Sequence, residues 1–466
     1  MKKIMKKILL FAAFIVAMSA QAQDYWTEYA TSQPAASTGM RSISIVDDNV
    51  VWLSNSCGTT GCTPIRRYSL STDSGLTWTT NAIDLGVTSA NLEIANICGV
   101  SATTAFAAVF PRAAGAAQGV YKTTDGGLTW VRQSSASFNN AASFCNLVHF
   151  WDENIGVTMG DATDPDTPGS YYEIYTTTNG GANWTRVPKA NIAGGANPLA
   201  ADDYGLTNQF TVSGNTIWFG TTYGEAFRST DRGLTWTKAQ TPIPDFGGGI
   251  NGQESGDMSF TSETKGLLQT SDYQLFETLD GGSTWNAVLY QGPIRNFGIS
   301  EIPGQADQYI SVGEDLDNSQ RGSSYSIDGG LNWISINDNP DSSYVQGGVI
   351  AMRNSLVGFA SGFSTSASVG GIYKWNGNPL SLSTPSFSNE GDFVASLNQG
   401  TGVLNLAGAN IANVVIFDIL GKQVFAGNYD GLSTVDVNVA SFNSGVYMVR
   451  VTNTEGSSSA IKVVKQ

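Results

Sequence analysis

Short runs of β-branched and aromatic residues alternate with Gly, Asn and Asp along most of this chain. Runs of this kind, bounded by turn residues, are typical of β-strands. Over the first period the pattern predicts strands at residues 41–46, 50–53, 65–70 and 77–83. The same succession of short strands recurs as far as residue 375. The pattern therefore predicts an all-β fold built from repeated four-stranded units.

A polar motif recurs at the turn between the third and fourth strands of each unit. It consists of Asp or Asn, any residue and then Gly, and a Trp follows five residues after the Asp or Asn. The Asp or Asn positions are Asp73, Asp125, Asn179, Asp231, Asp280 and Asp328, spaced by 52, 54, 52, 49 and 48 residues. A period of about 50 residues matches a four-stranded propeller blade. Because Asp bonds to nearby backbone and Gly adopts positive φ, we expect these motifs to be structural turns.

A seventh unit lacks its last strand. The strand pattern continues after the sixth motif up to residue 375, and no fourth strand follows it. Trp26-Thr27, near the start of the chain, matches Trp78-Thr79, which opens a fourth strand. We therefore expect residues 24–30 to complete blade seven of a seven-bladed propeller over residues 23–379. Closing the ring in this way removes an edge that would pair with other chains.

The motif and its spacing resemble the Asp-box, or BNR, repeat of sialidases, sortilin-type receptors, certain xyloglucanases and photosystem assembly factors. The resemblance implies a β-propeller whose boxes are structural and lie on the face away from any active site. Sialidase activity is not expected, because the Arg-Ile-Pro stretch of that family stands reversed here, as Pro64-Ile65-Arg66 and Pro293-Ile294-Arg295. Sialidases also have six blades, and the xyloglucanase cleft lies between two propellers, whereas one seven-bladed propeller is expected here.

The first 22 residues have the features of a secretory signal peptide. A basic start precedes an apolar run over residues 8–18 that is too short to span a bilayer, and Ala20-Gln21-Ala22 suits cleavage. No later stretch of the sequence is long and apolar enough to cross a membrane. Removing this segment removes four lysines and no acid, so the net charge changes from −15 to −19. Such an acidic chain repels phosphate backbones, so we expect no nucleic-acid partner.

The repeat stops well before the C-terminus. We expect a linker over residues 380–389 and a β-sandwich of about seven short strands over residues 390–466. Segments 415–424 and 444–451, with the basic end at 462–465, resemble the C-terminal sorting domain of type IX secretion cargo. The resemblance implies that the type IX secretion machinery carries the protein from the periplasm across the outer membrane, to be released or surface-attached. An ordinary adhesive sandwich is the alternative.

Candidate functional groups are expected on one face of the ring. The turns between second and third strands share that face with the connections between blades, and these loops are the longer and more varied ones. The turn at residues 160–169 carries Asp161, Asp164 and Asp166, which are candidate ligands for Ca²⁺. Asp161, Asp164 and Glu314 are candidate catalytic acids, which in a glycosidase stand roughly 5 to 9.5 Å apart. A solvated acidic loop is the alternative.

Four aromatic residues in or near these loops are candidates for stacking on a sugar, namely Tyr204, Tyr223, Phe246 and Tyr273. Packing at the loop bases is the alternative. We expect a monomeric, non-catalytic binding protein for a glycan or a protein. One alternative is a glycoside hydrolase or lyase acting on extracellular polysaccharide, and another is an assembly or scaffold factor. The fold alone does not choose among these functions.

The chain contains four cysteines and one histidine. Cys57 and Cys62 bracket a short loop, and we expect a disulfide between them in an oxidising compartment. Aligning the blades pairs Cys98 with His149, four residues from Cys145, which puts the two cysteines about 13 Å apart. A disulfide requires Cα atoms within about 7 Å, so two buried free thiols are the alternative to a bridge. His149 falls on an inner strand, where packing or channel lining is expected.

Overall fold

The computed structural model describes residues 25–59, 63–113, 116–136, 138–140, 142–162, 170–192, 203–247, 255–313, 321–336, 345–377, 393–419, 422–454 and 458–465. The chain forms two compact units, residues 1–380 and 381–466, and each is described separately. The expected signal peptide, residues 1–22, and the expected linker, residues 380–389, lie outside the described residues. No described helix is long and apolar enough to pass through a bilayer.

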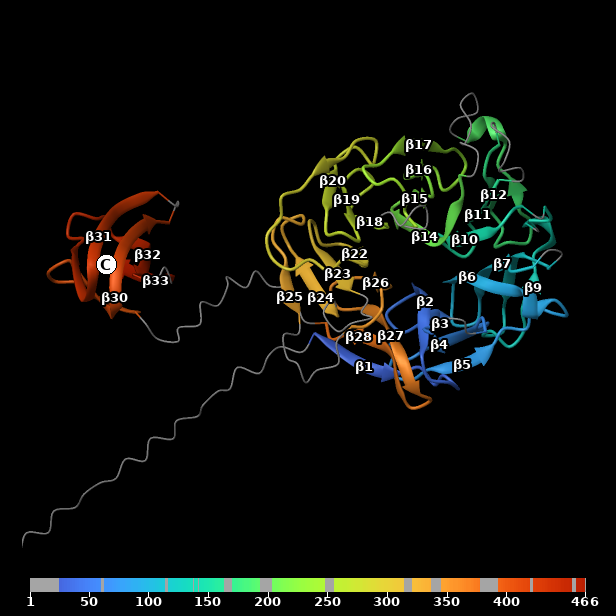
Figure 1. Ribbon diagram of the computed structural model, residues 1–466, viewed down its shortest axis with the longest axis horizontal. Coiled ribbons are helices and arrows are strands. Elements are labelled where there is room, and N and C mark those ends of the chain that lie inside the picture. Colours follow the sequence, from blue (N-terminus) through green and yellow to red (C-terminus); the bar gives the residue numbers. More distant parts are fainter. Residues whose placement is uncertain are drawn as a thin grey trace, which may run out of the picture. The chain divides into compact units, whose positions relative to one another are not determined.

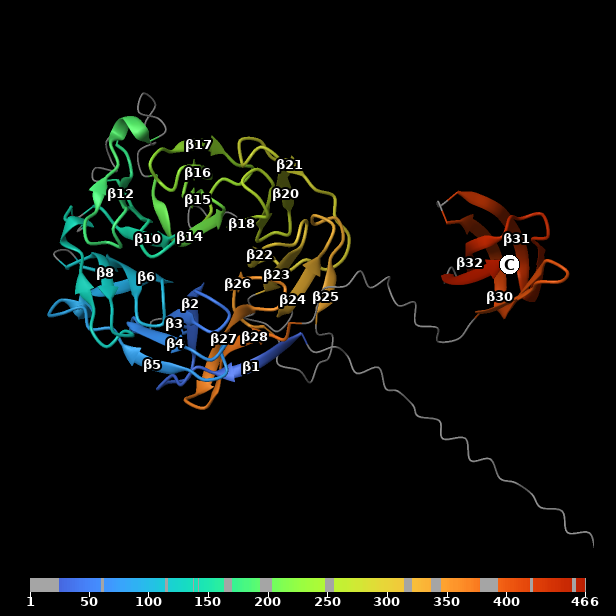
Figure 2. The ribbon, with the colours of Figure 1, turned by 180° about the vertical axis from the view of Figure 1, so that it is seen from behind.

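The first unit is a β-propeller of four-stranded antiparallel sheets around a central axis (Figures 1 and 2). Blade one consists of β2 (Thr38–Ile45), β3 (Val51–Cys57), β4 (Arg67–Ser71) and β5 (Thr79–Ala82). Blade two consists of β6 (Leu92–Gly99), β7 (Ala105–Pro111), β8 (Gly119–Thr123) and β9 (Val131–Arg132). Blade three consists of β10 (Cys145–Phe150), β11 (Gly156–Gly160), β12 (Glu173–Thr177) and β13 (Thr185–Arg186). Blade four consists of β14 (Gly205–Ser213), β15 (Thr216–Thr221), β16 (Glu225–Ser229) and β17 (Thr237–Gln240). Blade five consists of β18 (Gly256–Phe260), β19 (Gly266–Thr270), β20 (Leu275–Thr278) and β21 (Asn286–Ala287). Blade six consists of β22 (Gly298–Glu301), β23 (Tyr309–Gly313), β24 (Gly322–Ser326) and β25 (Ile334–Ile336). Three short 3₁₀ helices lie in described connections between blades: η1 (Ser89–Asn91), η2 (Ser134–Ala136) and η3 (Lys189–Asn191).

Blade seven takes its outermost strand from the start of the chain. Its strands are β26 (Ile350–Met352), β27 (Gly358–Ser366), β28 (Val369–Trp375) and β1 (Trp26–Ala30). β1 pairs antiparallel with β28, with Trp26 opposite Trp375 and Ala30 opposite Gly371. The buried Trp26 indole also donates to Ser323 Oγ of blade six at 2.9 Å. The expected all-β fold class with a seven-bladed propeller is confirmed.

Neighbouring blades share hydrophobic clusters all around the ring. Between blades one and two, the rings of Trp52, Tyr68 and Trp130 lie 5.3 to 6.4 Å apart. Between blades seven and one, Trp78 meets Phe359 edge-on at 6.0 Å. Each blade therefore buries apolar area on both of its faces, and burial of that area is the main force that holds the ring together.

The six repeated turns are held by the same pattern of hydrogen bonds. In blade two, Asp125 Oδ1 accepts the Thr129 backbone N–H at 2.9 Å, and Oδ2 accepts the Thr129 hydroxyl at 2.6 Å. These bonds hold the pKa of Asp125 low, at about 2. The Trp130 indole closes the turn by donating to Gly127 O at 3.0 Å. The same turn donates a backbone N–H to Thr103 O, between strands one and two, so both turns lie on one face.

The second unit is a five-stranded sheet around one hydrophobic core. Its strands are β29 (Phe393–Asn398), β30 (Val403–Asp418), β31 (Gln423–Asn438), β32 (Gly445–Asn453) and β33 (Ser458–Lys465). The prediction of about seven short strands is wrong, because β30 and β31 each continue for 16 residues. Register shifts between Ala407 and Asn413 bend this pair without ending it. Leu404 and Leu406 from one half of β30 share the core with Ile416 from the other half.

Candidate functional site

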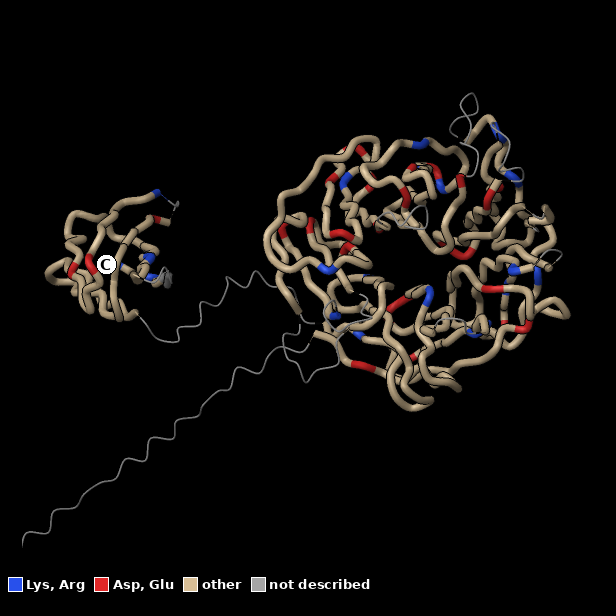
Figure 3. The backbone as a smooth tube through the Cα atoms, viewed as in Figure 1, with Lys and Arg blue, Asp and Glu red and all other residues tan. Residues whose placement is uncertain are grey.

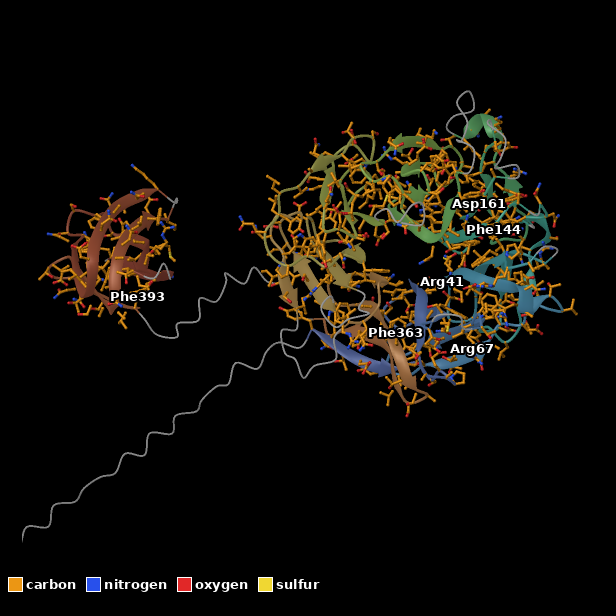
Figure 4. The ribbon with its side chains drawn as sticks, viewed as in Figure 1. Arg41, Arg67, Phe144, Asp161, Phe363 and Phe393 are labelled. Carbon is orange, nitrogen blue, oxygen red and sulfur yellow. The ribbon has the colours of Figure 1, made fainter. Side chains whose placement is uncertain are left out.

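The inner strands of all seven blades line a cavity of about 690 Å³ on the propeller axis. These strands are β2, β6, β10, β14, β18, β22 and β26. Polar side chains from several blades face the cavity, among them Arg41, His149, Asp257 and Glu301. Figure 3 shows acidic residues beside the central opening, and Figure 4 places Arg41 there. A cavity of this volume is within the usual range for small-molecule sites.

Several polar side chains of the inner strands accept hydrogen bonds from the backbone of the next blade. Ser42 Oγ of β2 accepts the Ile97 N–H of β6 at 3.0 Å, and Asn96 Oδ1 of β6 accepts the Val148 N–H of β10 at 2.9 Å. Further acceptors of this kind are Ser44, Cys98, Asp257, Ser259 and Ser300. Because an inner strand has one edge without a β-partner, these side chains supply the hydrogen bonds that its N–H groups need.

Two neighbouring carboxyl groups, Asp257 of β18 and Glu301 of β22, face the cavity. Burial raises the pKa of Asp257 to about 6 and that of Glu301 to about 7. Asp257 accepts the Ile299 N–H at 3.1 Å and the Gln209 amide at 3.3 Å, and Glu301 accepts the Ser259 hydroxyl. These bonds join blades four, five and six. Sequence reasoning missed both acids, although a charged residue within an inner strand is unusual enough to be a signal.

His149 lines the cavity from β10, as expected. Its ring meets Trp151 edge-on at 4.7 Å and lies 6.0 Å from the ring of Phe210. Burial lowers the pKa of His149 to about 4, so the imidazole is neutral at pH 7. Its Nε2 atom has no hydrogen-bond partner among the described residues. The surroundings of His149 are those of a packed, channel-lining side chain rather than of a catalytic base with an orienting partner.

Cys98 and Cys145 are buried free thiols, which confirms the alternative to a bridge between them. Burial raises the pKa of Cys98 to about 11 and that of Cys145 to about 12, so neither forms a thiolate near neutral pH. The Cys98 sulfur accepts the Phe150 N–H at 3.3 Å, which gives it a structural role. Cys57 ends β3, and Cys62 lies outside the described residues, so the Cys57–Cys62 disulfide stays a prediction.

Of the predicted catalytic and metal-binding acids, one lies within the described residues. The other three, Asp164, Asp166 and Glu314, lie outside them. Asp161 follows β11 directly, near Phe144 in blade three (Figure 4), and is 5% exposed. It accepts the Asn146 amide at 2.7 Å and the Gly205 N–H at 2.8 Å, and burial raises its pKa to about 8. No cluster of three or more His, Cys, Asp or Glu suited to a metal occurs in the described part of the chain. The catalytic and Ca²⁺ roles of this loop stay predictions.

Asp203, in the connection between blades three and four, interacts with Asp161. It is 1% exposed, and hydrogen bonding to the Thr221 side chain and to the Tyr223 backbone offsets part of the rise in its pKa that burial causes. Tyr172 is fully buried beside both acids, and its side chain hydrogen-bonds with that of Asp203. Burial raises the pKa of Asp203 to about 7 and raises that of Tyr172 well above its usual value. Sequence reasoning identified Asp161 in this cluster and missed the other two residues.

Two exposed tyrosines stand on equivalent turns of neighbouring blades. Tyr223 lies between β15 and β16 and is 41% exposed, and Tyr273 lies between β19 and β20 and is 36% exposed. Tyr273 has a φ of +69°, at the position where blade four has Gly224 with a φ of +66°. The Tyr290 hydroxyl donates to Tyr273 O at 2.7 Å. A left-handed conformation costs a non-glycine residue about 1–2 kcal/mol, so Tyr273 is strained where a glycine is not.

The other two candidate stacking residues have different surroundings. Phe246 is 2% exposed and packs with Trp218 and Met258 in the core between blades four and five. Its ring fills the space beside Gly220, where a Cβ atom would meet it at 2.4 Å. The alternative of packing at a loop base fits this burial, and because Phe246 also lines the axial cavity, its role as a stacking residue stays a prediction. Tyr204 is partly buried, and its role stays a prediction.

The ring of blades and the separate sheet unit define a β-propeller protein with an appended C-terminal domain. Residues 398–466 match the family model described as a secretion system C-terminal sorting domain. The second unit is thus a type IX sorting domain, and its secretion machinery handles the protein. The protein is exported to the cell surface or the extracellular space.

No curated protein matches the chain in sequence. Among solved structures, YCF48 bound to a D1 peptide is similar, with a TM-score of 0.51 and 14% identity over 78% of this chain and 98% of that one. YCF48 from Cyanidioschyzon merolae has a TM-score of 0.51 and 17% identity over 76% of this chain and 99% of that one. An ancestral GH74 enzyme has a TM-score of 0.47 and 12% identity, over 94% and 63% of the two chains. The two YCF48 structures share the propeller fold with this chain.

Proposed function

We propose that this exported propeller is a non-catalytic binding protein that holds a glycan or protein ligand on the face formed by the turns between second and third strands. The observation that carries this proposal is Tyr273, a solvent-exposed aromatic residue in a left-handed conformation. Backbone strain of this kind persists where the surrounding structure enforces it, and it clusters at functional sites. Tyr223 presents a second exposed ring on the equivalent turn of the next blade.

Two tyrosines on adjacent blades suit a ligand longer than one sugar ring or one side chain. Tyrosine supplies a large apolar face and a polar tip, and it loses little conformational entropy on binding. The Tyr290 hydroxyl bond to Tyr273 O steadies the turn that carries the ring. YCF48 was solved with a peptide bound, so a peptide ligand is as reasonable as a glycan for a propeller of this fold.

The described carboxyl groups favour binding over hydrolysis. Asp161 is almost fully buried and bonded to Asn146 and Gly205. Asp257 and Glu301 face the cavity, but each is bonded to a neighbouring strand. A glycosidase needs one carboxyl group free to protonate the leaving group and a second that acts as nucleophile or base.

Binding to a glycan array and to a library of extracellular peptides tests the proposal with the double variant Tyr223→Ala/Tyr273→Ala. We expect this variant to bind at least about tenfold more weakly than the wild type, because loss of aromatic anchors typically costs more than 1 kcal/mol each. Leu128→Ala removes an exposed apolar side chain from the opposite face and is the matched control.

Equal binding by the wild type and the double variant would refute the proposed surface. Mass spectrometry of the incubated glycans separates the two enzyme alternatives from binding. Release of shorter saccharides would show that the protein is a hydrolase, and unsaturated products would show that it is a lyase.

A further inference from the structure

The charged residues of blades one and two are divided unequally between the two faces of the propeller. At the face formed by the turns between second and third strands, these blades carry five arginines and two acids, namely Arg41, Arg66, Arg67, Arg112, Arg132, Asp84 and Glu93. At the face of the repeated turns they carry one lysine and four acids, namely Lys122, Asp47, Asp48, Asp73 and Asp125. The first face therefore has a local charge of +3, although the chain as a whole carries −15.

Three of the five arginines meet at the first two residues of β6. Arg41 and Arg112 both donate to the Glu93 carboxylate, Arg112 at a distance of 2.6 Å. Arg66 Nη1 donates to Leu92 O at 3.3 Å. We call Arg41, Arg66, Arg112 and Glu93 the arginine cluster. Because its one carboxylate balances only one of three guanidinium groups, the arginine cluster keeps a charge of +2, and the side chain of Arg112 is 52% exposed.

The acids on the other face of these blades do little to cancel this charge. A five-residue strand such as β8, which runs from one face of the blade to the other, is roughly 17 Å long. Exposed charges are largely screened from one another beyond about 8 Å at physiological ionic strength. The arginine cluster therefore acts on a ligand as a local site of positive charge.

We propose that the arginine cluster binds carboxylate groups of an acidic polysaccharide, one that is built from uronic acids. A guanidinium group is planar and presents paired N–H donors that match a carboxylate. Exposed amide side chains lie beside these arginines: Asn91 O accepts the Arg112 N–H at 2.8 Å, and Asn139 Oδ1 accepts Arg132 Nη2 at 3.3 Å.

Arginines together with amides favour a uronic acid over an acidic peptide. An amide side chain offers both donors and acceptors, which the hydroxyl groups of a sugar require, while the arginines take up its carboxylate. The inference rests on the proposed function, because it names the class of ligand for the same face of the propeller.

Binding of the full-length protein to polygalacturonate, dextran and polyglutamate, measured by microscale thermophoresis, tests the class of ligand. Polygalacturonate carries a carboxylate on each sugar, dextran carries none, and polyglutamate carries its carboxylates on a peptide. We expect the tightest binding to polygalacturonate, and this binding should weaken several-fold when the NaCl concentration is raised tenfold, because salt screens exposed charges. Tighter binding to dextran or to polyglutamate would overturn the inference.

The double variant Arg66→Gln/Arg112→Gln tests the site itself. It removes two positive charges, and it should weaken polygalacturonate binding at least about tenfold, because charge-assisted hydrogen bonds are the stronger ones. Arg232→Gln is the matched control, since it removes an arginine that is paired with Asp152 at 3.2 Å on the face of the repeated turns. This control should leave the affinity unchanged.

Glu93→Gln changes the charge of the arginine cluster in the other direction. The amide keeps the size of the side chain and leaves three guanidinium groups without a carboxylate, so we expect polygalacturonate to bind several-fold more tightly. A purely structural role of Glu93 would not produce this gain. Equal affinity of the wild type and Arg66→Gln/Arg112→Gln would overturn the inference, whether or not Glu93→Gln folds.

The variants also separate this inference from the proposed function. If Arg66→Gln/Arg112→Gln weakens binding and Tyr223→Ala/Tyr273→Ala does not, the arginine cluster is supported and the tyrosine surface is refuted. If only the tyrosine variant weakens binding, the proposed function is supported and the acidic ligand is overturned.

Discussion

At the scale of single residues, buried polar side chains fall into two groups. Ser42 and Asn96 represent the first, because they accept N–H groups from the edge of the next inner strand. Asp203 and Tyr172 represent the second, since burial raises the pKa of both side chains. Tyr273 belongs to neither group, because its ring reaches solvent and its backbone is strained. Of these residues, Tyr273 is the one on which the proposed binding function rests.

Replacing Tyr273 by Gly measures the strain at the proposed binding face. We expect the free energy of unfolding to rise by about 0.5–1 kcal/mol, because glycine accepts a positive φ without a steric penalty and loses part of that gain to unfolded-state entropy. Chemical denaturation measures the change. Tyr223→Gly, at a residue without a positive φ, is the control and should lower stability by a similar amount. A Tyr273→Gly protein less stable than the wild type would contradict the strain.

The carboxyl groups of Asp257 and Glu301 predict how stability depends on pH. Their pKa values in the folded protein, about 6 and about 7, lie above the ordinary values of 3.8 and 4.5. Between about pH 4 and pH 7 the folded protein therefore holds more protons than the unfolded chain, so the free energy of unfolding falls as pH rises through this window.

Glu301→Gln should reduce this fall, by on the order of 1 kcal/mol between about pH 5 and pH 8. Denaturation curves at the two pH values provide the measurement. The slope is reduced rather than abolished, because Asp161 and Asp203 also have raised pKa values and act in the same direction. The same fall in the wild type and the variant would show that Glu301 does not titrate in this range.

At the scale of elements, the repeated turns made most of the propeller predictable. A fixed spacing of a turn motif and a Trp identifies the same strand in every blade, and Trp26-Thr27 marked the closing strand in the same way. The continuous β30 and β31 were not predictable, because turn-type residues such as Asn410 and Gly431 interrupt the strand pattern, whereas the two strands stay paired across the bulges. The buried position of Phe246 was hidden for a related reason, since its neighbours along the chain are turn residues.

The candidate site was less predictable than the fold. Asp161 was identified from a local cluster of acids, whereas Asp203 and Tyr172 meet it through contacts between distant segments. Exposure is likewise a property of the folded ring, so sequence patterns did not separate Tyr273 from Phe246.

The closing strand β1 gives a prediction about stability. Trp26→Ala removes a large side chain that is 2% exposed, packs edge-on against Trp375 at 5.0 Å and bonds to Ser323. We expect a loss of about 3–5 kcal/mol in the free energy of unfolding, as for other buried aromatic residues. Thr27→Ala, at the adjacent exposed position, should change it by less than about 1 kcal/mol.

At the scale of the whole molecule, the chain combines a β-propeller with a domain for export. The two compact units have separate hydrophobic cores, so we expect each to keep its fold without the other. Deleting residues 381–466 should leave the unfolding midpoint of the propeller unchanged within about 2 °C. In cells the truncated protein should stay in the periplasm, which fractionation and immunoblotting detect. Surface exposure of the truncated chain would contradict the role of the sorting domain.

The division of the propeller into a face of repeated turns and a face of loops proposed to bind a ligand depends on a ring of seven blades closed by β1. Hydrogen exchange of the peptide that covers residues 25–31, followed by mass spectrometry, tests this closure most directly. We predict that about half of its amides, those that point toward β28, exchange as slowly as the amides of β28, because Trp26 to Ala30 pair with Trp375 to Gly371 and β1 is the outermost strand. Exchange within seconds, as in an unpaired segment, would contradict the closed ring and the assignment of faces that rests on it.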